Sequence, residues 1–404
     1  MVSQAIHLPV SLAHSMSSAA DWDHGPRRMA TARPGQWLYL FADEGVLYSE
    51  CLNRFIGLNA AGISAYRAFD AGASVEELNL LNHFAPPYET AGSLAAIHAL
   101  SRGVFPPEDT PIAWPSLHQP SISNLEIGGI PTRVDFPSGP LQELCRDYFR
   151  NCPPASGPAK CHISAHRLQE GWTISINACA ILSSLRDEQL GLGFLHAARS
   201  LLYAESNYDI AFHAAMVSTP EFGLLLAGPR EAGKSTLAAY LIAHGFDLLS
   251  DEPALLDLDS GKVALLNLPI SLKQGSWVVL GREWENAPLH VRSDGTKIRL
   301  LHSTPENRSS SRRLTHIIFP EFRPSGSAGA DRLQPLQALN LLNEAGMVLA
   351  KDISRNQFEA FLKMICSTPA YTLRYSSLQE GALVIGDILG EDHDWQTSSG
   401  YAKL

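Results

Sequence analysis

Residues 222–252 read FGLLLAGPREAGKSTLAAYLIAHGFDLLSDE. The first six residues are a short apolar run, as a buried strand requires. Gly228–Ser235 then satisfies the pattern G-x-x-x-x-G-K-[ST], and Leu237 and Leu241 share one face of a helix that ends at His244-Gly245. Strand, loop and helix follow in the order that a phosphate-binding loop needs. The sequence therefore predicts a strand–loop–helix unit that binds a nucleoside triphosphate.

The whole loop is expected to contact the phosphates of the nucleotide. Its backbone N–H groups point at phosphate oxygens, and the helix N-terminus adds partial positive charge. Lys234 would bridge the β- and γ-phosphates, and the Ser235 hydroxyl would bind Mg²⁺. The nucleotide-binding residues are predicted to be Gly228, Pro229, Arg230, Glu231, Ala232, Gly233, Lys234, Ser235 and Thr236.

A second strand follows at Phe246–Ser250 and ends in two acids, Asp251 and Glu252, with Asp251 16 residues after Ser235. Because one helix and one turn fill that interval, we expect this strand beside the first, with its end near the loop. Asp251 then serves as an Mg²⁺ contact or as a general base toward an attacking hydroxyl, and Glu252 can hold the metal. The alternative is a pair of acids that simply faces water.

His213 precedes the loop strand. If residues 214–217 pair as a hairpin with residues 224–227, His213 lies near one end of the site. Residue type alone favours a structural histidine.

Composition restricts the function classes. The chain has 404 residues, 45% of them hydrophobic, and a net charge of −10, which disfavours nucleic acid and anionic membrane as partners. No apolar run is long enough for a membrane span, and no signal peptide is expected. The six cysteines form no CxxC pair, and reduced thiols in a cytoplasm are the simplest account. Cys161, His162 and His166 fit a structural role in a strand better than a metal site.

The predicted fold class is α/β (mixed α+β), and the chain is predicted to divide into five regions. The block at 36–105 is predicted to be a small winged-helix domain, with strands at 37–41 and 45–48 and helices starting at Asn59, Ser74 and Thr90. The regions are a flexible tail at 1–33, this domain at 36–105, a Pro-rich linker at 106–120, a second domain at 121–390 and a polar tail at 391–404.

The stretch from His213 to Lys273 resembles the C-terminal domain of HPr kinase/phosphorylase, and more closely the HPr-kinase-related proteins of peptide-modification gene clusters. The resemblance rests on His213-Ala214-Ala215, the 228–236 loop, His244-Gly245 and Asp251-Glu252. It implies a P-loop kinase core of the HPr kinase/PEP-carboxykinase-like type that uses ATP or GTP with Mg²⁺. It also implies that Asp251 is the catalytic acid/base, that His213 and Lys234 act in the site, and that Lys273 touches phosphate or substrate.

Three departures from that family matter. Arg230 and Glu231 replace the usual Ser and Gly, the acidic pair is Asp-Glu rather than Asp-Asp, and the Pro-Gly-Arg-Asn segment of the phosphate-removing reaction has no counterpart. HPr as substrate and phosphorylase activity are therefore not expected.

The first block resembles the PqqD-like fold, which binds the leader peptides of ribosomally made, modified peptides. The resemblance rests on residues Leu58–Gly62 and Phe69–Leu78. Such domains add the leader as a strand at a sheet edge. A DNA-binding winged helix is the alternative, but residues 36–105 hold three basic residues against seven acids, which opposes contact with phosphates.

Together these features predict a kinase of a Ser or Thr hydroxyl in a ribosomal precursor peptide, whose leader the first block captures. Related kinases phosphorylate lasso-peptide precursors, so the resemblance implies that substrate class. A kinase of free serine or another small hydroxyl compound, and a non-catalytic nucleotide sensor, remain alternatives. The resemblance leaves a homo-oligomer open.

Overall fold

The computed structural model describes residues 26–31, 34–41, 44–50, 53–71, 120–168, 171–280, 288–292, 295–302, 311–350 and 353–390. The chain forms two compact units. The first comprises residues 1–107 and 332–370, and the second residues 108–331 and 371–404. Both mix helices with sheets, so the expected mixed α/β class is confirmed.

The first unit contains a four-stranded antiparallel sheet in the order β1-β2-β3-β4. Its elements are β1 (Arg27–Ala30), β2 (Gln36–Phe41), β3 (Glu44–Ser49), β4 (Arg54–Leu58) and α1 (Ala60–Asp70). Asn59 caps α1 as predicted, because its side chain accepts a hydrogen bond from the Gly62 N–H (2.8 Å). The expectation of a flexible tail is wrong for β1, which pairs with β2. The helices predicted from Ser74 and Thr90, most of the 106–120 linker and the 391–404 tail lie outside the described residues.

Both faces of this sheet are covered, because successive side chains of a strand point to opposite sides. Leu38 and Leu47 pack with Ile63 of α1. Tyr48 faces the other way and stacks on Phe358 at 4.0 Å between ring centroids. Phe358 belongs to α9 (Arg355–Ser367), which follows α8 (Pro335–Glu344) and β22 (Val348–Leu349). The sequence placed these elements in the 121–390 domain, but their contacts assign residues 332–370 to the first unit.

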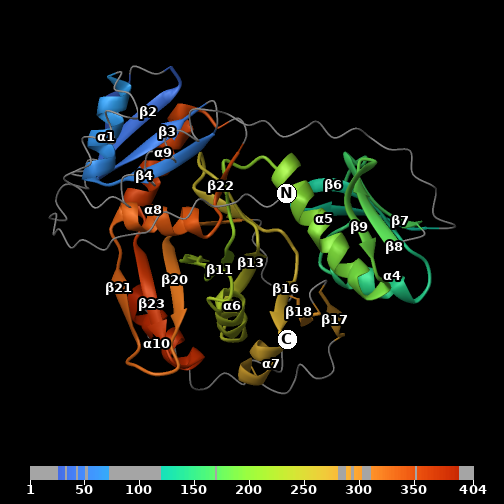
Figure 1. Ribbon diagram of the computed structural model, residues 1–404. Helices are drawn as coiled ribbons and strands as arrows, with labels where there is room; N and C mark the ends of the chain where they lie inside the picture. Colours follow the sequence, from blue (N-terminus) through green and yellow to red (C-terminus); the bar gives the residue numbers. More distant parts are fainter. Residues whose placement is uncertain are drawn as a thin grey trace. The chain divides into compact units, whose positions relative to one another are not determined.

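The second unit begins with a five-stranded sheet in the order β5-β6-β7-β8-β9, drawn in green in Figure 1. The long helix α5 packs against this sheet. Gly193 of α5 allows the approach, since an added Cβ would lie 2.5 Å from Ile174 Cδ1. The elements are β5 (Ser121–Ile127), β6 (Ile130–Phe136), α4 (Pro140–Asp147), β7 (Cys161–Leu168), β8 (Gly171–Ile176), β9 (Cys179–Leu185), η3 (Asp187–Gln189) and α5 (Leu190–Glu205).

A six-stranded sheet in the order β13-β11-β12-β20-β23-β21 carries the 228–236 loop. β12 runs parallel to β20 and antiparallel to β11. The prediction that the strand ending at Asp251 lies directly beside the loop strand is wrong, because β11 lies between β13 and β12. The elements are β11 (Ala215–Ser218), β12 (Gly223–Leu226), α6 (Lys234–Ala243), β13 (Asp247–Asp251), β20 (His316–Phe322), β21 (Gly329–Arg332), β23 (Ala370–Tyr375) and α10 (Leu378–Leu389).

Smaller strand groups complete this unit. β19, β15, β14 and β10 are neighbours in that order, and β16, β18 and β17 form a three-stranded sheet. Within the described ranges, no helix is long and apolar enough to cross a membrane. The remaining elements are β10 (Ile210–Phe212), β14 (Ala254–Asp257), β15 (Lys262–Ala264), β16 (Ile270–Lys273), α7 (Gln274–Leu280), β17 (His290–Val291), β18 (Lys297–Leu301) and β19 (Ser311–Arg313).

Candidate functional site

The 228–236 loop joins a buried strand to the start of a helix, as predicted. β12 is fully buried, and α6 begins at Lys234 immediately after Gly233. Three loop residues have positive φ: Gly228 (145°), Glu231 (69°) and Gly233 (87°). Glycine adopts such angles without cost, but a glutamate rarely does. Glycine would adopt the backbone angle at position 231 more easily than glutamate does. The replacement of the family's usual glycine by Glu231 therefore places a residue with a side chain at a position of positive φ.

Lys234 folds back over its own loop. Its Nζ donates to the carbonyl oxygens of Gly228 (2.7 Å) and Pro229 (2.9 Å). Burial lowers the pKa of Lys234, while the carboxylates of Glu252 and Asp251 oppose that shift. The Lys234 ammonium group therefore lies against the loop, as the sequence predicted.

Asp251 meets Ser235 at the end of β13, which confirms the expectation that this strand ends near the loop. Ser235 Oγ donates to Asp251 Oδ1 at 3.0 Å, and the Ser271 N–H lies 3.4 Å from Asp251 Oδ2. Burial raises the pKa of Asp251, and the positive charge of Arg199 opposes the rise. The alternative of an acid facing water is excluded for Asp251, because only 7% of the residue is exposed.

Glu252 turns to different partners from those of Asp251. Its Oε1 lies 2.7 Å from His213 Nδ1, and its Oε2 lies 3.7 Å from an Arg199 guanidinium nitrogen. Burial alone would raise its pKa, but the hydrogen bond from His213 and the charge of Arg199 lower the pKa of Glu252 to about 2. The hairpin predicted from residues 214–217 forms, with Ala215 opposite Leu226. His213 therefore lies at the site, paired with a charged carboxylate.

Arg199 is a site residue that the sequence analysis missed. It lies on α5 and also donates to the main-chain oxygen of Asp251 at 3.0 Å. One side chain thus ties both residues of the acidic pair to a helix 52 residues earlier in the chain. No local pattern marks an arginine in the middle of a helix as part of a remote site.

Lys273, predicted to touch phosphate or substrate, pairs with Glu231 of the loop. Its Nζ lies 3.0 Å from Glu231 Oε1. The hydrogen bond and charge of Lys273 lower the pKa of Glu231. Lys273 also lies close enough to lower the pKa of Lys234, as does Arg230. The loop tip therefore carries a cluster of cations and a single acid.

Two neighbours of the loop come from elements that the sequence did not predict. Thr236 Oγ1 lies 2.7 Å from the hydroxyl of Ser276 on α7. The Tyr375 hydroxyl, at the end of β23, would lie 3.0 Å from a Cβ added to Gly233. Burial raises the pKa of Tyr375 to about 12, so its hydroxyl stays protonated. The Ser276 hydroxyl thus holds the first turn of α6, and the Tyr375 hydroxyl leaves little room for a side chain at Gly233.

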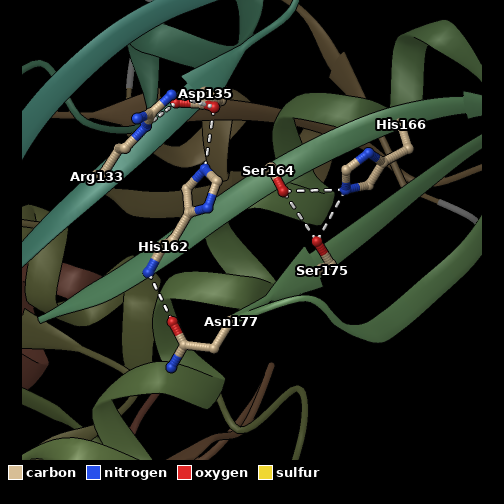
Figure 2. A network of polar contacts seen from close by, with 7 residues as sticks. All are labelled: Arg133, Asp135, His162, Ser164, His166, Ser175 and Asn177. Carbon is tan, nitrogen blue, oxygen red and sulfur yellow. Dashed lines mark hydrogen bonds and ion pairs between the residues drawn. The ribbon is translucent and has the colours of Figure 1, made fainter. Parts of the chain in front are cut away.

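The three candidate metal ligands on β7 do not converge. Cys161 is buried with the core of the second unit, whereas His162 and His166 belong to the alternate set of β7 positions. Figure 2 shows His162 beside Asp135 (3.0 Å), and His166 beside the hydroxyls of Ser164 and Ser175, each at 3.0 Å. These are structural polar contacts, as the sequence analysis favoured.

Ser235 and Asp251 supply adjacent hard oxygen atoms, the ligand type that Mg²⁺ prefers. Among the described residues, no group of three or more His, Cys, Asp or Glu side chains has a metal-binding arrangement. Any cation here would therefore need oxygen atoms from a bound phosphate as well. Glu252 does not join Asp251, because His213 and Arg199 engage its two oxygens.

Comparison of the sequence with protein-family models and with curated proteins finds no match.

Proposed function

We propose that this protein is an ATP-dependent kinase with a phosphate loop and core of the HPr-kinase-like type. The observation that carries the proposal is the Ser235–Asp251 hydrogen bond (3.0 Å), which joins the first turn of α6 to the end of β13. Lys234 lies in the same loop. A cation, a hydroxyl and a carboxylate thus surround the N-terminus of one helix, the arrangement that binds a nucleoside triphosphate. GTP is the other candidate nucleotide.

Mg²⁺ fits the oxygen pair of Ser235 and Asp251, and when bound it would neutralise charge on the transferring phosphate. The chain's own groups supply the rest. The loop N–H groups and Lys234 bind and orient the triphosphate. Lys234 leaves the Gly228 and Pro229 carbonyls when phosphate oxygens replace them as its partners.

The proposed acceptor is a Ser or Thr hydroxyl of a ribosomally made precursor peptide of the lasso type. This part rests on the resemblance of residues 58–78 to PqqD-like domains, together with the acidic balance of the first block. In the described part of the first unit, the sheet has edge strands β1 and β4. A leader bound at an edge would raise the local concentration of its core segment near the kinase site.

The test combines purified protein, Mg-ATP and a precursor peptide from the same gene cluster, and scores a phosphate mass gain by mass spectrometry. Full-length and leaderless forms of the peptide are compared, with free L-serine as a third acceptor. Faster transfer to the full-length peptide than to the leaderless form supports both the kinase activity and the leader-binding role. Equal transfer to the leaderless form would remove the leader-binding role, and transfer to serine alone would favour a small-molecule kinase.

Deleting the first block is a poor test of its role. Phe358 is fully buried and stacks on Tyr48 of β3, so removing residues 36–105 would expose the apolar face of α9. Fluorescence anisotropy of a labelled leader peptide on the intact chain measures leader binding without that damage.

A further inference from the structure

We propose that the ring of Phe322 is the platform on which the purine base of the bound nucleotide stacks. The inference rests on the proposed function, because it assigns the base subsite of the same nucleotide. The two flanks of the 228–236 loop differ in chemistry, and this difference gives a bound triphosphate a direction.

One flank of the loop carries the oxygen ligands. Ser235 Oγ donates to Asp251 Oδ1 at 3.0 Å, and Asp251 ends β13, which lies beyond β11 in the sheet. The terminal phosphate and Mg²⁺ belong at this flank, because they need such hard oxygen atoms. The sugar and the base therefore extend toward the opposite flank of β12, which is formed by β20 and β23.

β20 ends at the same edge of the sheet as the loop strand. β12 and β20 are parallel, with Leu226 opposite Ile318, and β20 continues beyond Ile318 to Phe322. Phe322 and Ile318 point to the same face, because an even number of residues separates them. Ile318 belongs to the core that also contains α6 residues. Phe322 thus lies on the α6 side of the sheet, at the edge where α6 begins; Figure 1 shows β20 and β23 next to each other there.

Tyr375, the last residue of β23, connects Phe322 with the loop. Its ring lies 5.8 Å from the Phe322 ring between centroids, in an edge-to-face arrangement. Its hydroxyl, at the far end of the side chain, would lie 3.0 Å from a Cβ added to Gly233. A single tyrosine side chain spans the interval between the loop and Phe322. The Phe322 ring is therefore within reach of a base whose phosphates occupy the loop.

The exposure of Phe322 suits a stacking role. It is 53% exposed, and it is the only aromatic ring among the large exposed apolar side chains of the described residues. Tyr375 is buried and supports the ring from beneath. A single exposed apolar residue is ordinary on a protein surface, but this ring lies on the flank where the base belongs. Because every base has a π-face, stacking accepts adenine and guanine alike.

Calorimetric titration tests the subsite with Mg-ATP, Mg-GTP and Mg-tripolyphosphate, the last of which has the phosphates but neither sugar nor base. We expect Phe322→Ala to raise the Kd of both nucleotides about tenfold and to leave the Kd of tripolyphosphate unchanged. Phe322→Leu, which stays apolar but has no ring, should also lose affinity for the nucleotides. Phe322→Trp should keep it.

Ile122→Ala is the matched control. Ile122 is also about half exposed (50%), but it lies on β5 of a different sheet. This variant should leave all three dissociation constants at their native values. Thermal melts confirm that each variant is folded.

The fluorescence of the Phe322→Trp variant reports stacking directly. ATP should quench the added indole, whereas tripolyphosphate should not. The native chain has seven tryptophans, so the same titration of the native protein is subtracted.

Two outcomes would overturn the assignment. The first is a Phe322→Ala variant that binds Mg-ATP as tightly as the native protein; if it also transfers phosphate normally, the kinase proposal stands without this base subsite. The second is an equal loss of affinity for Mg-ATP and Mg-tripolyphosphate, which would locate the effect at the phosphates. A native protein that binds neither ligand would refute the proposed function, and the base subsite with it.

Discussion

Glu231→Gln should tighten nucleotide binding. Glu231 occupies the tip of the 228–236 loop, where its carboxylate is exposed and pairs with Lys273 at 3.0 Å. A triphosphate bound in the loop would place several negative charges near this carboxylate. The substitution keeps the shape of the side chain, removes the like charge and frees the Lys273 ammonium for the phosphates.

The size of the effect follows from Coulomb's law. For charges about 6 Å apart in water, a ligand of charge about −2 and a screening length of about 8 Å at 0.15 M salt, the affinity should rise about threefold. With a screening length of about 30 Å at 0.01 M, the gain should be about sevenfold. At 1 M salt it should nearly vanish.

Titration of a fluorescent ATP analogue with Mg²⁺ at the three salt concentrations measures the change. Lys273→Met is the reciprocal variant and should weaken binding. The double variant should return toward the native affinity, since both charges of the pair are then removed. An exposed glutamate outside the site, Glu188, which pairs with Arg186, supplies the control variant Glu188→Gln with no expected change.

Weaker binding by Glu231→Gln, or a gain that does not fall with salt, would refute this reasoning. Weaker binding would mean that Glu231 contributes a direct contact to the nucleotide or its cation, and a gain independent of salt would mean that its effect is not electrostatic. Glu231→Gly then separates charge from backbone strain, because glycine adopts the φ of 69° without a side chain.

Two further predictions concern stability. Asp147 is buried; burial opposes its ionised form, but hydrogen bonds from His290 and His302 hold its pKa well below the usual range. Asp147→Asn should therefore cost about 3 kcal/mol at pH 7, and the difference from native, followed by denaturant unfolding, should shrink as the pH falls below about 4; a constant difference would contradict the ion-pair account. Phe358→Ala removes a fully buried ring that stacks on Tyr48 and should destabilise the first unit by about 3 to 5 kcal/mol, seen as selective loss of hydrogen-exchange protection in β2 to β4; equal loss in α6 and β12 would argue against a separate unit.

The local part of the site follows from the sequence because its determinants are local. An apolar run, a loop with glycines at two positions of positive φ, and a helix face lie within residues 222–252. The position of Asp251 beside Ser235 could be predicted for the same reason, since a single helix and turn separate them.

The strand order could not be predicted in this way. β11 is a fully buried strand of four residues, three of them apolar, and so short a run does not favour pairing with one neighbour over the other. Only the whole sheet decides that it lies between β12 and β13. Arg199 could not be identified from the sequence for a similar reason. Its contact with Asp251 depends on where α5 packs rather than on its sequence neighbours.

Two helices show further limits of local sequence. The run Trp277-Val278-Val279 has strand-type residues but forms α7, whose Ser276 holds Thr236. At these residues, packing within the folded chain outweighs the preference of tryptophan and valine for strands. α9 carries a capping box of its own, but no property of its sequence shows that its apolar face belongs to the sheet of the first unit.

The central claim is phosphate transfer from the 228–236 loop to a peptide hydroxyl. The most direct measurement is the mass of a precursor peptide after incubation with the native protein and Mg-ATP, beside a parallel reaction with Lys234→Met. The account predicts a gain of one phosphate with the native protein and no gain with the variant. An unchanged peptide mass with a native protein that binds Mg-ATP would contradict it.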